Sequence, residues 1–194
     1  MKTPARALRL IAACTVLTVF AGCGGSSTTT SISLSGTITG LTDVGLVLSN
    51  GTSSVALSAN STSFFLPTRV LIGSAYSVVP TALPATLTCT VNKGIGIAPS
   101  GDITDIQVAC VPRHSLGGTI TGLTTDGLTL ANGSDTVAVA RSAQSFTFPT
   151  QVGQGFSYGV TILKQPVPQT CSVVANNSGI MGMADINNVQ VACK

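Results

Sequence analysis

The stretch "SLSGTITGLT" (residues 33–42) decides the fold, because it returns as "SLGGTITGLT" at residues 115–124. Two further pairs of stretches follow in the same order and support one duplication. "LVLSNGTSSVAL" (46–57) matches "LTLANGSDTVAV" (128–139), and "DITDIQVAC" (102–110) matches "DINNVQVAC" (185–193). Two copies of about 80 residues are fewer than a solenoid needs. They therefore predict two separate small domains.

Each copy has the pattern of an all-β domain. In "GTITG" and "VQVAC" the apolar residues occupy every second position, as on one face of a strand. Asn50-Gly51 and Asn132-Gly133 lie between apolar runs, which is a strong hairpin signal. Short runs bounded by Gly, Asn and Pro are typical of a β-sandwich. We predict about seven strands per copy, and those of the first copy begin near residues 33, 46, 54, 63, 75, 86 and 103.

Four of the six cysteines lie within the copies, namely Cys89, Cys110, Cys171 and Cys193. Four cysteines permit three pairings, and the duplication favours Cys89 with Cys110 and Cys171 with Cys193. If each pair joins antiparallel neighbours, closing a loop of about 20 residues stabilises the domain by roughly 3 kcal/mol. The alternative is a metal site, but the spacing is unlike C-x-x-C and no histidine recurs with it. We therefore expect disulfides and no metal.

The N-terminus has the features of a secretory signal. Lys2, Arg6 and Arg9 precede an apolar run that ends before Cys23, and the run is shorter than the roughly 20 residues of a spanning helix. "FAGC" (residues 20–23) resembles a bacterial lipobox, which implies a signal peptide at 1–22 and a diacylglyceryl group on Cys23. The alternative is an ordinary cleaved signal with a free Cys23.

The polar segment after Cys23 predicts a flexible tether. "GGSSTTTS" (residues 24–31) has no large apolar side chain to bury, so we assign 23–31 to the lipidated cysteine and its tether. Gly24 replaces the Asp that retains lipoproteins at the inner membrane in the enterobacterial sorting pattern. By that analogy we expect an outer-membrane lipoprotein of the cell envelope, periplasmic or surface-facing, held to the membrane through its lipid.

The copies also resemble a known module. "GTITGL", "QPVPQTC" (residues 165–171) and the closing "VQVAC" resemble a tandem immunoglobulin-like or prealbumin-like module common in proteobacterial envelope proteins. The resemblance spans residues 33–193. It implies an all-β chain with two tandem immunoglobulin-like β-sandwich domains, at 32–111 and 112–194. Its motifs specify structure rather than activity.

Charge argues against nucleic acid as a partner. Three of the nine basic residues precede Cys23, and the rest of the chain carries six basic residues against six aspartates. Nucleic-acid binding needs a cationic stripe, which this balance does not supply.

The candidate catalytic and metal-ligating residues are few. "GFSYG" (residues 155–159) fits G-x-S-x-G around Ser157, but it leads into a strand pattern and no histidine follows it. Asp102 and Asp105 lie three residues apart, and Asp102 aligns with Asp185. We interpret these aspartates as turn caps, with a weak calcium site as the alternative. We predict no catalytic residue and no cofactor.

The aromatic residues and the linker between the copies give two further expectations. Most aromatic residues recur in both copies and are expected in the cores, whereas Phe65 and Phe156 lack an aromatic counterpart and are expected to be exposed. Arg113 and His114, in "VPRHS" (residues 111–115), are expected in a solvated hinge between domains that stand end to end.

These observations predict a lipid-anchored envelope protein with a structural, adhesive or protein-binding role and no catalysis. Its partner would be another envelope protein, bound in part by strand pairing at exposed sheet edges. The alternative is a lipoprotein that binds a glycan or small ligand through its interdomain loops.

Overall fold

The computed structural model describes residues 30–194, in which every regular element is a β-strand. The predicted all-β fold class is therefore confirmed. The predicted signal peptide (residues 1–22), the lipidation site Cys23 and the tether up to residue 29 lie outside the described residues. Among residues 30–194, no helix has the length and apolar character that a membrane crossing requires.

The first repeat (residues 33–110) folds as two facing sheets, in the manner of an immunoglobulin-like sandwich. Its strands are β2 (Leu34–Thr39), β3 (Leu46–Asn50), β4 (Ser53–Leu57), β5 (Ser63–Phe65), β6 (Val70–Leu71), β7 (Ala75–Ala82), β8 (Leu87–Asn92), β9 (Ile95–Ile97) and β10 (Ile103–His114), preceded by β1 (Ser31–Ile32). One sheet has the order β4-β3-β7-β9, and the other has the order β8-β10-β2-β5.

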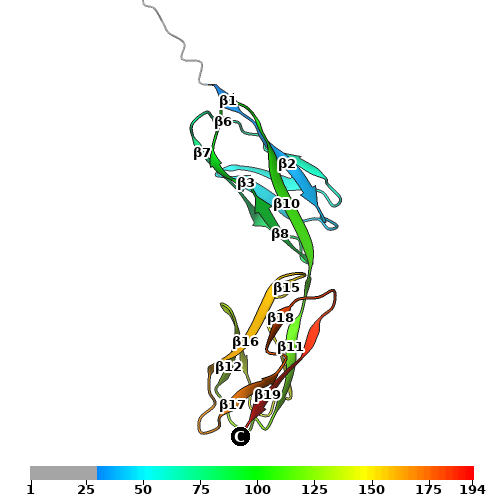
Figure 1. Ribbon diagram of the computed structural model, residues 1–194, viewed down its shortest axis with the longest axis vertical. Coiled ribbons are helices and arrows are strands. Elements are labelled where there is room, and N and C mark those ends of the chain that lie inside the picture. The colour runs from blue at the N-terminus through cyan, green and yellow to red at the C-terminus, as the bar shows by residue number, and fades with distance from the viewer. Residues whose placement is uncertain (1–29) are drawn as a thin grey trace, which may run out of the picture.

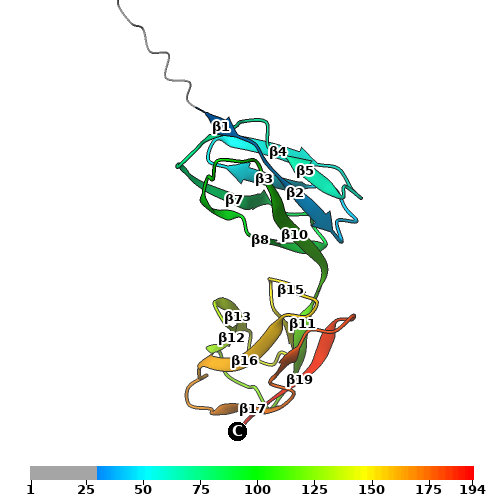
Figure 2. The ribbon, with the colours of Figure 1, turned by 45° about the horizontal axis from the view of Figure 1, so that its top comes forward.

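The second repeat (residues 115–193) has the same arrangement. Its strands are β11 (Leu116–Thr121), β12 (Leu128–Asn132), β13 (Asp135–Val139), β14 (Ser145–Thr147), β15 (Val152–Gly153), β16 (Ser157–Lys164), β17 (Cys171–Ala175), β18 (Ser178–Ile180) and β19 (Ile186–Cys193). The two sheets have the orders β13-β12-β16-β18 and β14-β11-β19-β17. Figures 1 and 2 show both repeats as lobes of one elongated molecule.

Most predicted strands are present where the sequence pattern places them. The seven expected strand starts of the first repeat lie within one residue of the starts of β2, β3, β4, β5, β7, β8 and β10. The predicted hairpins are present, β3 with β4 and β12 with β13; Asn50 and Asn132 end their strands, and the turns between the strands are Gly51-Thr52 and Gly133-Ser134. The strands β1, β6 and β9 have two or three residues each, too few to show an alternating pattern, and were not expected. β5 is equally short, but its stretch "SFFLP" (63–67) has the counterpart "SFTFP" (145–149) in the second repeat.

Each repeat has its own cluster of buried apolar side chains. The cluster of the first repeat draws on both sheets, and its fully buried members include Leu34 on β2 and Leu48 on β3. Leu116 on β11 and Leu130 on β12 occupy the corresponding places in the second cluster. Burying one such side chain contributes about 1.5–3 kcal/mol, so the alternating strands supply the main driving force for folding.

The first and last long strands of each repeat lie side by side and parallel. β2 pairs with β10, and β11 pairs with β19. The strands approach so closely that a Cβ atom on Gly36 would lie 2.0 Å from the carbonyl oxygen of Ile106. A Cβ atom on Gly118 would lie 1.9 Å from the carbonyl oxygen of Val189. The glycine in each copy of the opening motif is therefore required by the packing of the backbone.

One strand joins the two repeats. β10 continues beyond the first disulfide to His114 and pairs antiparallel with β15 of the second repeat, where Arg113 lies opposite Gly153 and His114 opposite Val152. The boundary expected between residues 111 and 112 lies inside this strand. In Figures 1 and 2 the lobes stand end to end on β10, which runs directly into β11.

The same connection exists at the start of the first repeat. β1 pairs antiparallel with β6, and the N–H of Ile72 donates to the carbonyl of Thr30 at 3.1 Å. At the junction between the repeats, the N–H of Gln154 donates to the carbonyl of Pro112 at 2.8 Å. In each repeat a short strand, β6 or β15, therefore pairs with the segment of chain that leads into the repeat.

The predicted solvated hinge is wrong. The guanidinium of Arg113 donates to the carbonyl oxygens of Pro84 and Ala85 at 2.8 and 2.6 Å, and the His114 side chain is only 18% exposed. This segment is held by its pairing with β15, which has two residues and leaves no recognisable pattern in the sequence.

Candidate functional site

Two disulfides join strands within the repeats. Cys89 on β8 lies directly opposite Cys110 on β10, with an S–S distance of 2.04 Å. Cys171 on β17 lies opposite Cys193 on β19, with an S–S distance of 2.00 Å. All four cysteines are buried, so each bond closes one antiparallel strand pair against its own core.

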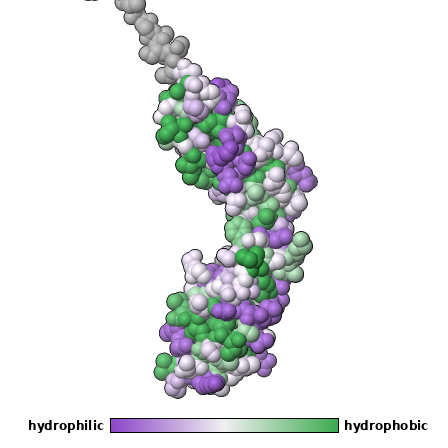
Figure 3. Space-filling model, in the orientation of Figure 1, coloured by the Kyte–Doolittle hydropathy of each residue, from purple (hydrophilic) through white to green (hydrophobic). Residues whose placement is uncertain are grey.

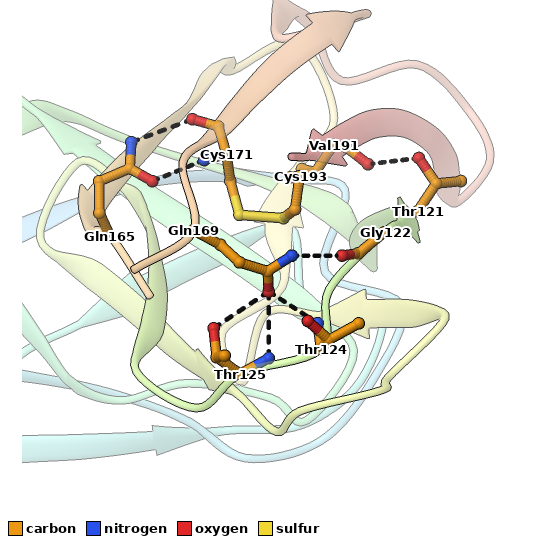
Figure 4. Close-up of a disulfide and its surroundings, with 9 residues drawn as sticks. All are labelled: Thr121, Gly122, Thr124, Thr125, Gln165, Gln169, Cys171, Val191 and Cys193. Atoms are coloured by element: carbon orange, nitrogen blue, oxygen red, sulfur yellow. Dashed lines mark hydrogen bonds between the residues drawn. A yellow bond between two sulfur atoms is a disulfide. The ribbon is translucent and has the colours of Figure 1, made fainter. Parts of the chain in front are cut away.

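Gln165 fixes the strand that carries the second disulfide, as Figure 4 shows. Its Nε2 donates to the carbonyl of Cys171 at 3.0 Å, and its Oε1 accepts from the N–H of Cys171 at 2.8 Å. This two-point contact satisfies both backbone groups of the cysteine at the start of β17.

Gln169 holds the neighbouring loop in the same region (Figure 4). Its Oε1 accepts hydrogen bonds from the backbone of Thr124 and from both the backbone and the hydroxyl of Thr125, at 2.8 to 3.1 Å. Its Nε2 donates to the carbonyl of Gly122 at 2.7 Å. The motif "QPVPQTC" is therefore a structural clamp around a disulfide.

The first repeat fixes the corresponding loop by other means. Leu83 and Leu87 stand where the second repeat has the two glutamines. There the loop carbonyls accept from Arg113, and the hydroxyl of Thr86 donates to the carboxylate of Asp43. The departure of "LPATLTC" from the motif is thus compensated by contacts that come from the junction strand and from the loop before β3.

The two equivalent aspartates hold the ends of distant segments together. Oδ1 of Asp102 accepts from the N–H of Ser33 at 2.7 Å, and Oδ1 of Asp185 accepts from the N–H of Ser115 at 2.8 Å. The hydrogen bond from Ser33 lowers the pKa of Asp102 below its ordinary value, because it stabilises the carboxylate. Our interpretation as local turn caps is wrong, since each aspartate fastens the start of its repeat to the last strand.

Asp105 does not join Asp102 in one site. Its carboxylate pairs with Nζ of Lys93 at 2.9 Å, whereas Asp102 faces Ser33 and Arg69. Within residues 30–194, no group of three or more histidine, cysteine or carboxylate side chains is placed to hold a metal ion.

Ser157 lies at the start of β16, where its backbone pairs with Ile180 on β18. A nucleophile elbow places its serine on a tight turn between a strand and a helix. Here the residue is already part of a strand, so the G-x-S-x-G pattern in "GFSYG" does not form an elbow.

The aromatic side chains divide as predicted. Phe64, Phe146 and Phe148 are buried, whereas Phe65 is 53% exposed and Phe156 is 42% exposed. Phe156 lies beside the junction, where it lines an open cavity of about 290 Å³ together with Thr88 of the first repeat. Polar residues of the second repeat complete the lining, among them Asn132, Ser134, Asp135 and Gln151.

No protein-family model and no curated protein sequence match the chain. Solved structures with some similarity include a single B repeat unit of a collagen-binding surface protein of Staphylococcus aureus, at 15% identity and a TM-score of 0.30, covering 85% of this chain and 98% of that one. A streptococcal ancillary pilin gives 11% identity and a TM-score of 0.36, covering 85% of this chain and 63% of that one. The TIE protein of Bacillus anthracis gives 14% identity and a TM-score of 0.28, covering 84% of this chain and 34% of that one. The chain thus spans less than two thirds of the latter two proteins, and likeness at this level carries no function over to it.

Proposed function

We propose that this chain is a lipid-anchored protein of the bacterial cell envelope with a structural, adhesive or protein-binding role and no catalysis of its own. The observation that carries the proposal is the continuous strand β10, which belongs to the sheet of the first repeat and also pairs with β15 of the second. This strand joins the two repeats into an elongated support, as expected of a protein that holds a binding surface away from a membrane.

The N-terminal residues supply the anchor in this proposal. "FAGC" ends at Cys23, and the polar segment after it would connect the lipid to the first repeat. The repeats at 32–111 and 112–194 then act as two domains in line, in an outer-membrane lipoprotein that faces the periplasm or the surface. The two disulfides support an oxidising compartment outside the cytoplasm.

Lipid attachment is tested by labelling cells that produce the full chain with tritiated palmitate. We expect label on the unmodified chain and on Cys14→Ser, because Cys14 lies inside the predicted signal peptide. We expect none on Cys23→Ser, which lacks the thiol that receives the lipid. Equal labelling of Cys14→Ser and Cys23→Ser would contradict the proposed anchor.

A second candidate function is binding of a glycan or another small polar ligand at the junction. The exposed ring of Phe156 lies beside hydroxyl, amide and carboxylate side chains in the junction cavity. An exposed aromatic ring beside hydrogen-bonding groups offers contacts to both the apolar face and the polar groups of such a ligand.

A glycan array distinguishes this candidate from a purely structural role. We expect specific binding by the full chain to fall at least about tenfold in Phe156→Ala, a loss of about 1.4 kcal/mol. Phe65→Ala is the matched control. Phe65, like Phe156, has no aromatic counterpart in the other repeat, but it lies on β5 and does not line the cavity. Absence of specific binding, or equal binding by both variants, would contradict the ligand-binding candidate, and the structural role would be the one that remains.

A further inference from the structure

The strand β9 forms an open edge of the first repeat. It is the last strand in the order β4-β3-β7-β9 and, within residues 30–194, pairs only with β7. The carbonyl of Gly94 accepts from Val78 at 2.7 Å, and the N–H of Ala98 donates to Ser74 at 2.8 Å. Because backbone groups alternate in direction along a strand, those of Ile95 and Ile97 point away from β7. Both residues therefore present an N–H and a C=O to an additional strand.

The side chains at this edge are apolar and exposed. Ile95 is 73% exposed and Ile97 is 65% exposed, and Val79 on β7 is 40% exposed on the same face of the sheet. Figure 3 shows apolar surface at the side of the upper lobe where Figure 1 labels β7. Sheet edges are commonly protected by a lysine or a proline. β9 contains neither within its three residues; Lys93 and Pro99 flank it, and Lys93 is paired with Asp105.

The second repeat has the same edge with less apolar surface, because Ile180 is exposed there but the two other apolar side chains are missing. In β18, Ser178 occupies the position of Ile95, while Ile180 corresponds to Ile97. On the neighbouring strand β16, Thr161 stands where the first repeat has Val79. The fold therefore requires no apolar side chain at the positions of Val79 and Ile95, and the combination of three exposed apolar side chains at this edge is particular to the first repeat.

We propose that β9 pairs antiparallel with β9 of a second copy of this chain, about a twofold axis at Gly96. Ile95 then lies opposite Ile97 of the second copy, and Ile97 lies opposite its Ile95. Each of these two pairs exchanges two backbone hydrogen bonds through the groups that point outward. The two four-stranded sheets become one, and four isoleucines meet on its outer face. This inference deepens the proposed protein-binding role and rests on it.

The chemistry of the edge favours a second copy as the occupant. Any partner strand must be uncharged and apolar on alternate residues. The sequence Ile95-Gly96-Ile97 is the same read forwards and backwards, so β9 itself meets this requirement as an antiparallel partner. In the twofold register Lys93 lies opposite Pro99 of the second copy, so like charges do not face each other. Three-residue strands bury less than the roughly 1,200 Å² of a stable complex, so we expect a dimer that dissociates on dilution.

Sedimentation equilibrium of the full chain in detergent tests the dimer. We expect concentration-dependent dimers between about 1 µM and 1 mM, and a dissociation constant at least tenfold weaker for Ile97→Lys, because the ammonium group would be buried against isoleucine. Ile180→Lys is the matched control, since Ile180 occupies the same position in the second repeat and is 64% exposed. A chain that stays monomeric throughout, or equal effects of the two lysines, would overturn the proposal.

Cross-linking with an added oxidant tests the register. Full chains carrying Ile95→Cys and Ile97→Cys are expected to cross-link to each other when mixed but not when either is alone, and the chain without either substitution controls for the native cysteines. Self-linking of Ile97→Cys would contradict the twofold register. Palmitate labelling of Ile97→Lys is expected to equal that of the unmodified chain, which separates failure of the dimer from failure of the anchor.

Discussion

Gly118→Ala is expected to lower the free energy of unfolding of the second repeat by more than about 3 kcal/mol. The added Cβ atom would lie 1.9 Å from the carbonyl oxygen of Val189 and 2.7 Å from its carbonyl carbon. These are backbone atoms of the parallel pair β11–β19, so no side-chain rotation relieves the clash. The strands must separate, which also opens the core beneath Leu116.

Tyrosine fluorescence during urea unfolding measures this effect. The chain has two tyrosines and no tryptophan, so in a Tyr76→Phe background the signal of Tyr158 reports on the second repeat. Gly159→Ala is the control, because a Cβ atom there meets nothing within 4 Å. Its effect should stay within about 0.5 kcal/mol. Equal effects of the two substitutions would show that the parallel pair tolerates a side chain.

Removal of the second disulfide by Cys171→Ala with Cys193→Ala is expected to lower the free energy of unfolding of the second repeat by about 3 kcal/mol. The bond joins residues that are 22 apart in the sequence, and its loss restores the conformational freedom of that loop in the unfolded chain. Urea unfolding followed through Tyr158 gives the change directly.

The first disulfide provides the control for this experiment. Cys89→Ala with Cys110→Ala removes the equivalent bond, which lies in the other core. If the repeats are two domains as proposed, the transition reported by Tyr158 keeps its midpoint in this variant. A midpoint that falls equally with either pair would mean that the two repeats unfold as one unit.

Local patterns account for what the sequence predicted correctly. Leu34, Gly36 and Ile38 face the core from alternate positions of β2. Gly51, whose φ is 58°, permits the sharp reversal between β3 and β4. Such features depend on a few neighbouring residues, and the duplication presents each of them twice. The exposure of Phe65 and Phe156 was also predictable, since a core position is expected to recur in both copies.

Features that depend on distant residues were not predictable in this way. The role of Asp102 depends on the N–H of Ser33, which is 69 residues away in the sequence. The order at Arg113 and His114 depends on β15, which is too short to recognise. The open edge at β9 was not predictable for the same reason. The sequence "IGI" shows neither that β9 pairs with β7 nor that its other backbone groups point outward, because both depend on the assembled sheet.

The parallel pairing of the first and last strands has a mechanical consequence. Because β2 and β10 run in the same direction, the chain enters each repeat at one end of this pair and leaves it at the other, and β11 with β19 repeats the arrangement. Traction on the two termini therefore loads all the hydrogen bonds of a pair in shear at the same time, rather than peeling them apart one by one. The chain passes from β10 into β11 with one residue between them, so the force is transmitted from one lobe to the next without first extending a linker.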